Sequence, residues 1–167
     1  MWDKKKKRGV NMENTQLDKN TVIKEVLNCA IESIRTVIPI EAQVGRPTLL
    51  TESFSHHAIG VFIGITGDLP GRLILEGSEE SFSRLGTKMF GMPIEGEMVE
   101  SFAGEVVNMI AGNMGAALFT KGITIDITPP TIIVGDSKIS GFRQAIKLPI
   151  AFQEAGEYEL VLNIEKG

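Results

Sequence analysis

Apolar residues recur at the spacing of an α-helix in three segments of the chain. Residues 21–38, TVIKEVLNCAIESIRTVI, place their apolar side chains on one side, and Pro39 ends the pattern. Ser78 is a suitable N-cap for a second helix over 79–90. A third helix is predicted over 95–121.

The remaining apolar runs are short, are bounded by turn residues and include stretches that alternate with a period of two. We expect strands in the segments 43–50, 58–66, 71–77, 122–128, 131–135, 142–153 and 157–165. The strands over 58–66 and 71–77 are joined by GDLPG, which predicts a hairpin. The order of elements indicates an α+β fold, with a mainly antiparallel sheet packed against long helices.

Length and composition indicate one soluble domain. The chain has 167 residues, of which 43% are hydrophobic and 23% are charged, and no apolar run approaches the roughly 18 residues of a membrane span. We expect a disordered basic tail over residues 1–13 and the folded domain over residues 14–167. The first residues lack the apolar core of a signal peptide, so we predict a cytoplasmic protein that does not bind membranes.

The basic run Lys4–Arg8 is the only feature that suggests nucleic acid. The whole chain nevertheless carries a net charge of −4, and it contains one Tyr and one Trp. An acidic body with so few stacking side chains excludes a nucleic-acid surface.

Metal-ligating residues are sparse. Cys29 is the only cysteine, which excludes a disulfide and a cysteine-built zinc site, and its helical spacing predicts a core position. His56 and His57 are adjacent and would face opposite sides of a strand. We therefore predict no metal site. The methionines are expected to fill the core, with the last two as candidates for the border of a partner surface: Met89, Met92, Met98, Met109 and Met114.

The third helix carries a narrow polar stripe. At about 100° per residue, its four members fall within an arc of about 60°: Ser101, Glu105, Asn108 and Gly112. The apolar residues that spread over the opposite side are Val99, Phe102, Val106, Met109 and Ile110. The helix is thus expected to pack one side on the sheet and to present the stripe.

Glycines in the same helix suggest a close approach. Gly104, Gly112 and Gly115 each cost up to about 1 kcal/mol of helix stability relative to alanine, so another backbone or a partner is expected to come near. A Glu-x-x-Asn pair alone is also common on ordinary helix surfaces, where the two side chains contact each other or water. Spacing alone leaves both readings open and favours the ordinary surface.

The stretch ESFAGEVVNMIAGN, residues 100–113, resembles the CheX branch of the CheC/CheX/FliY chemotaxis phosphatases. The matching pattern is Ser101, then Glu105 four residues on, then Asn108 three further, followed by MIAGN. The order of elements is also similar, from about residue 14 to the end. CheC relatives carry the motif twice, whereas the single copy found here suits CheX.

The resemblance implies a homodimer that dephosphorylates the receiver protein CheY, a cytoplasmic hydrolase of two-component signalling. The functional pair maps onto Glu105 and Asn108, and Glu105 is implied to bind the lysine beside the phosphorylated aspartate. We predict that Ser101, Gly104 and Gly112 contact the partner. The Mg²⁺ ion is expected to be held by the receiver, with no cofactor bound by this chain.

The chemistry of the two side chains agrees with those roles. An amide at Asn108 can orient a water molecule without adding negative charge near a phosphoryl group. No nucleophile or metal ligand is then required of this chain. The alternative is a receiver-binding or scaffold module of the same family that does not hydrolyse.

Overall fold

In the computed structural model, the described residues are 15–50, 54–56, 58–139 and 145–165. They form three helices: α2 (Thr15–Val37), α3 (Glu79–Phe90) and α4 (Glu97–Phe119). All three predicted helices are confirmed, although α2 begins six residues earlier than expected. The predicted basic tail lies outside the described residues.

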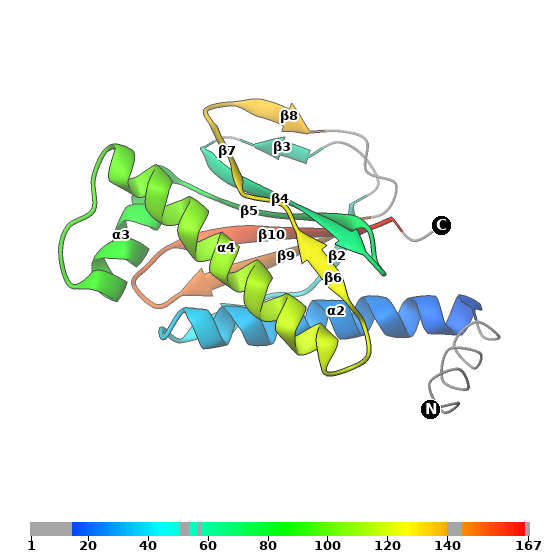
Figure 1. The fold of residues 1–167 in the computed structure, drawn as a ribbon. Coiled ribbons are helices and arrows are strands. Elements are labelled where there is room, and N and C mark those ends of the chain that lie inside the picture. The colour runs from blue at the N-terminus through cyan, green and yellow to red at the C-terminus, as the bar shows by residue number, and fades with distance from the viewer. Residues whose placement is uncertain (1–14, 51–53, 57, 140–144, 166–167) are drawn as a thin grey trace.

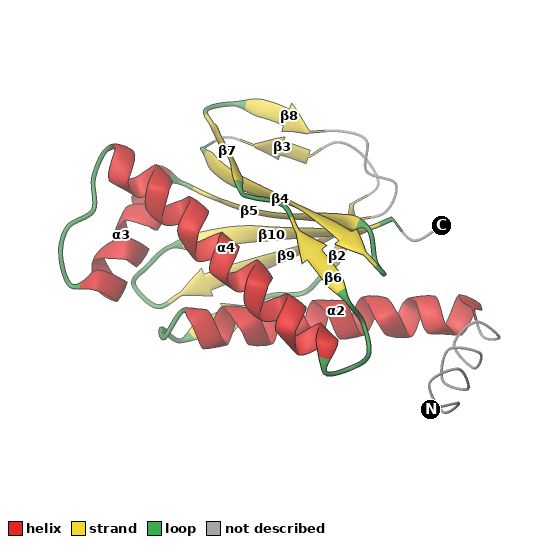
Figure 2. Cartoon of the chain, viewed as in Figure 1, coloured by secondary structure: helices red, strands yellow, loops and turns green. Residues whose placement is uncertain are grey.

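Most of the described strands form one large antiparallel sheet, which confirms the predicted α+β fold (Figures 1 and 2). The strands are β1 (Ala42–Val44), β2 (Thr48–Leu50), β3 (Phe54–His56), β4 (Ile59–Gly67), β5 (Gly71–Gly77), β6 (Ile125–Ile127), β7 (Thr131–Val134), β8 (Ser137–Ile139), β9 (Ala145–Phe152) and β10 (Glu157–Ile164). The main order is β1-β9-β10-β5-β4-β6, with β2 beside β9 and β7 beside β4. β3 and β8 form a separate pair.

The hydrophobic core lies between the sheet and the helices. In β4 the alternate residues Ile59, Val61, Ile63 and Ile65 are buried and share one cluster with α2, α3 and α4. The hairpin β4–β5 keeps this alternation in register, because Ile63 lies opposite Leu73. One face of the sheet is therefore covered by the helices, as Figure 1 shows for α2 and α4.

The central strands are also apolar on their second face. Ile74 of β5 and Val161 of β10 are directly paired and buried, and they form a small cluster with Ala145, Leu50 and Phe62. Burial on both faces explains why LIL in β5 and LVL in β10 are continuous apolar runs rather than alternating ones.

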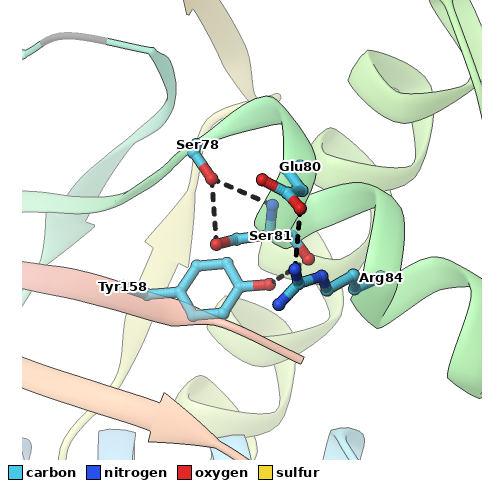
Figure 3. Close-up of polar contacts among 5 residues, drawn as sticks. All are labelled: Ser78, Glu80, Ser81, Arg84 and Tyr158. Atoms are coloured by element: carbon cyan, nitrogen blue, oxygen red, sulfur yellow. Dashed lines mark hydrogen bonds and ion pairs between the residues drawn. The ribbon is translucent and has the colours of Figure 1, made fainter. Parts of the chain in front are cut away.

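Helix α3 is fixed to β10 by a buried tyrosine (Figure 3). The hydroxyl of Tyr158 lies 2.6 Å from the carbonyl oxygen of Ser81 and 2.9 Å from that of Ala155. The Ser78 side chain caps the helix by accepting a hydrogen bond from the Ser81 amide at 2.9 Å. Burial raises the pKa of the Tyr158 hydroxyl well above its usual value. The N-terminal end of α3 is thus held to the sheet.

Helix α4 is the most apolar of the described helices. A stretch of 18 residues within it reaches a mean hydropathy of 1.2, so by length and composition it is apolar enough to cross a membrane. This differs from the expectation that no apolar run approaches the length of a membrane span. Half of that stretch is buried inside the protein, because α4 contacts α2, α3 and the strands β4, β6 and β7. We therefore assign α4 as a core helix.

Candidate functional site

The polar stripe of α4 is accessible on the side that faces away from the core. Ser101, Glu105 and Gly112 are exposed, and Asn108 is half-buried. Glu105 and Asn108 are three residues apart in a continuous helix, which separates their Cβ atoms by about 5–6 Å. The carboxylate and the amide are therefore neighbours that an approaching molecule can contact together.

Gly104 does not belong to this surface. It is buried, and a Cβ atom at this position would lie 3.0 Å from Cδ1 of Ile132 in β7. The expected close approach at this glycine therefore comes from the sheet of the same chain. We correct its assignment as a partner-binding residue.

The other two glycines of α4 have different surroundings. A Cβ atom on Gly112 would meet no described atom within 4 Å beyond the backbone of its own helix, whereas one on Gly115 would lie 3.5 Å from Cγ1 of Ile125. Gly115 thus allows β6 to pack closely against the helix. Gly112 has no such role within the described part of the chain, so its small size leaves room for a partner.

The methionines divide between core and surface, which corrects the prediction that they fill the core. Met114 is fully buried and so cannot border a partner surface. Met92, Met98 and Met109 are exposed. Met109 lies beside the polar stripe and not on the apolar side to which its spacing had assigned it. Cys29 is buried, as predicted.

A groove of about 500 Å³ adjoins the stripe between the end of α3 and the first half of α4. Its lining residues are Phe90, Met92, Ile94, Glu97, Met98, Ser101, Phe102 and Glu105. Two of the residues on the polar stripe, Ser101 and Glu105, thus form part of a mostly apolar depression. The sequence pattern did not reveal this groove, because the methionines that line it were interpreted as core.

Close packing between the two helices shapes the groove. A Cβ atom on Gly86 of α3 would lie 3.0 Å from Cγ1 of Ile94 and 3.3 Å from Cδ2 of Phe102. The Ser83 hydroxyl donates a hydrogen bond to the carbonyl of Ile94 at 2.6 Å. These contacts hold the α3–α4 connection against α3, so the wall of the groove is fixed by the fold.

Negative charge surrounds the candidate site. Glu97 and Glu105 line the groove, and no basic residue does so among the described residues. Glu97 lies in the first turn of α4, where its charge is favourable to the helix dipole. A positive group on an approaching molecule would be attracted to Glu105.

The site has side chains that can bind a partner and orient a water molecule. Within the described ranges, His, Cys, Asp and Glu form no group of three that could hold a metal ion. His57 lies outside the described residues. Asn108 supplies a carbonyl oxygen that accepts a hydrogen bond and an NH₂ group that donates. Such a pair can position a nucleophile that comes from the solvent.

Comparison with known proteins identifies the family of this chain. The family described as chemotaxis phosphatase CheX matches residues 59–150, a range that includes the whole of α4. The chain is also 33% identical over 150 residues to the CheY-P phosphatase CheX of Thermotoga maritima. That match covers 87% of this chain and 97% of the relative.

Solved structures with the same fold include two that are informative. A CheC-like protein from Shewanella sp. PV-4 has a TM-score of 0.74 at 23% identity, and the match covers 85% of this chain and 98% of that one. The CheX of Borrelia burgdorferi, solved as a complex with CheY, BeF₃ and Mg²⁺, has a TM-score of 0.72 at 26% identity, with coverage of 86% and 97%. From the sequence match and the shared fold together, we conclude that this chain belongs to the CheX family of chemotaxis phosphatases.

Proposed function

We propose that this protein is a phosphatase that hydrolyses the aspartyl phosphate of a CheY-type receiver domain. The observation that carries the proposal is that the exposed Glu105 and the half-buried Asn108 lie one turn apart on one face of α4, inside the region that matches the CheX family. The 33% identity to a CheY-P phosphatase supports the same activity.

Asn108 orients the attacking water. In the reaction, the water oxygen forms a bond to phosphorus as the bond between phosphorus and the aspartyl oxygen breaks, giving inorganic phosphate and a free carboxylate. The Asn108 carbonyl accepts a hydrogen bond from the water and so fixes its direction of attack. Positioning of this kind supplies a large share of the rate in phosphoryl transfer, where little covalent chemistry is left to the protein.

Glu105 binds the receiver. Its carboxylate is exposed, lies one turn from Asn108 and carries the negative charge that attracts a lysine side chain. A lysine beside the phosphorylated aspartate would then bring the phosphoryl group to Asn108. A neutral amide at Asn108 avoids a second negative charge next to the phosphoryl oxygens.

The metal ion in this reaction belongs to the substrate. Mg²⁺ held by the receiver neutralises charge on the phosphoryl oxygens, and the Borrelia burgdorferi complex contains CheY together with Mg²⁺. The residues of this chain supply the amide and the carboxylate. Ser101 and Gly112 flank them on the exposed stripe and contact the receiver surface.

The proposed assembly is a homodimer in the cytoplasm, where receiver proteins act. The short strands β1 and β6 end the main order of the sheet, and such ends offer backbone groups to a second copy. Size-exclusion chromatography with light scattering tests this; a monomeric mass at working concentrations would refute the dimer.

The test of the activity is the decay of a phosphorylated CheY-type receiver from the same organism, in Mg²⁺, with and without this protein. The proposal predicts a shortened phosphate lifetime at substoichiometric amounts of protein, which shows turnover. Binding that leaves the lifetime unchanged would contradict the phosphatase and would favour a scaffold module.

A further inference from the structure

We infer that the groove between α3 and α4 is a second contact point for the receiver, and that it accepts an apolar side chain located near the receiver lysine that meets Glu105. The inference rests on the proposed function and adds to it the chemistry of the partner surface. It assigns three exposed residues to recognition: Phe90, Met92 and Met98.

The exposure of these side chains is the first observation. Phe90 is 59% exposed, Met92 is 53% exposed and Met98 is 49% exposed, and all three line the same groove. Large apolar side chains scattered singly over a surface are ordinary, whereas a cluster of them around a depression is typical of an interaction site.

The groove is continuous with the polar stripe, and this continuity identifies the receiver as its occupant. Met98, Ser101 and Glu105 lie on successive turns of α4, and both Ser101 and Glu105 line the groove. Met98 and Glu105 are seven residues apart, so about 10 Å of helix separates them. A receiver domain whose lysine reaches Glu105 therefore contacts one edge of the groove.

The charge of the lining supports the same occupant. Glu97 and Glu105 border an otherwise apolar surface. This combination fits an apolar side chain with a positive group beside it. In a symmetric contact, a second copy of this chain would bring like charges together, because its groove carries the same carboxylates.

The groove combines a rigid wall with flexible side chains at its rim, which suits the binding of a receiver domain. Phe90 packs against Phe102, and Gly86 lets α3 and α4 approach, so one wall is fixed before binding. Met92 and Met98 are unbranched and can adjust to the shape of the incoming side chain. The receiver thus meets a preformed depression with an adaptable rim.

The test uses Phe90→Gln and Met98→Gln, with Leu49→Gln as a matched control. Leu49 is 63% exposed on β2, which lies away from α3 in Figure 1. Three quantities are measured for each variant: the KM and the kcat for the phosphorylated receiver, and the Kd for the same receiver loaded with BeF₃ and Mg²⁺, which mimics the phosphoryl group without being hydrolysed.

We expect each groove variant to raise KM and Kd by about tenfold, since part of an apolar contact is lost, with kcat changed less than about twofold. The Leu49→Gln control is expected to match the wild type. Thermal melting checks that Phe90→Gln stays folded, and Met98→Gln removes no aromatic contact with α3.

The outcomes separate the inference from the proposed function. Turnover by the wild type with unchanged KM and Kd in both groove variants would overturn the groove while leaving the phosphatase intact. Wild-type binding without turnover, combined with weaker binding by the variants, would overturn the phosphatase and support the groove. A change of oligomeric mass in the variants, with unaltered receiver affinity, would assign the groove to a second copy and overturn the inference.

Discussion

Phe90, the last residue of α3, packs edge to face against Phe102 of α4, with ring centroids 5.6 Å apart and an interplanar angle of 79°. The contact joins the wall of the groove to the helix that carries Glu105 and Asn108. Since α3 is also held to β10 through Tyr158, the groove and the polar stripe are parts of one packed unit. A receiver bound in the groove would therefore meet Glu105 and Asn108 at a fixed spacing.

Replacement of Glu105 is expected to weaken receiver binding more than catalysis. Glu105→Gln removes the charge and keeps the shape, so we predict a rise in KM of about tenfold or more, corresponding to roughly 1.4 kcal/mol, with kcat within about threefold. The effect should shrink at high salt, because it comes from a charge pair at an accessible site.

Glu100→Gln is the matched control for that experiment. Glu100 lies on the same helix about 140° around the axis from Glu105. The Glu100→Gln substitution therefore removes one negative charge without changing a residue of the polar stripe. Equal effects of the two substitutions would show that general charge, and not a specific pair at Glu105, governs binding.

Gly112→Ala separates stability from function. Apart from the backbone of its own helix, a methyl group at this position would meet no atom of the described residues within 4 Å, so the substitution should stabilise the helix by about 0.5–1 kcal/mol. If the receiver approaches closely at Gly112, the same methyl group should lower kcat/KM by about tenfold. Denaturant unfolding and phosphate decay measure the two effects.

Gly104→Ala gives the contrasting case. Its new Cβ would press on Ile132 inside the chain, so we predict no gain in stability and no specific effect on receiver binding in the folded protein.

Unaltered activity of Gly112→Ala would contradict the placement of the receiver over this part of the stripe.

Tyr158→Phe is expected to destabilise the fold and to leave the catalytic chemistry alone. The hydroxyl that lies 2.6 Å from the Ser81 carbonyl is lost, which costs about 1–2 kcal/mol. Denaturant unfolding measures this loss, and a free energy of unfolding equal to that of the wild type would contradict the anchoring role of Tyr158.

The same substitution should change the dependence of stability on pH. The folded pKa of Tyr158 lies above its ordinary value of 10.0, so above that pH the unfolded chain loses a proton that the folded chain keeps. The contribution of Tyr158 to the free energy of unfolding is therefore fully present below pH 10. It falls as the pH rises above 10, by up to about 1.4 kcal/mol per pH unit. Tyr158→Phe should lack this component. Because the chain has one tyrosine, tyrosinate absorbance follows this group alone.

The sequence predicted the elements better than their surroundings. The apolar run over 58–66 and the turn after it identified β4, and helical spacing placed Ser101, Glu105 and Gly112 on an accessible side of α4. The pairs β3–β8 and β7–β4 were not predicted, because short strands are defined by partners that lie far away in the sequence. Periodicity predicts the side of a helix or strand on which a residue lies. It does not predict which other element packs against that side.

The residues that were placed wrongly illustrate this limit. Gly104 was assigned to the partner surface because glycine indicates a close approach, but the approaching group is Ile132 of the same chain. Met92 and Met98 were interpreted as core because they are apolar, yet they are exposed on the groove. In each case the spacing was informative, and the neighbouring element decided the outcome.

The most direct measurement of the central claim is the effect of Asn108→Ala on kcat at saturating phosphorylated receiver, compared with the Kd for the receiver loaded with BeF₃ and Mg²⁺. Asn113→Ala, an amide about 140° away on the same helix, is the control. If the Asn108 amide orients the attacking water, kcat should fall by about a hundredfold or more while Kd changes less than about threefold. An unchanged kcat for Asn108→Ala would contradict the account.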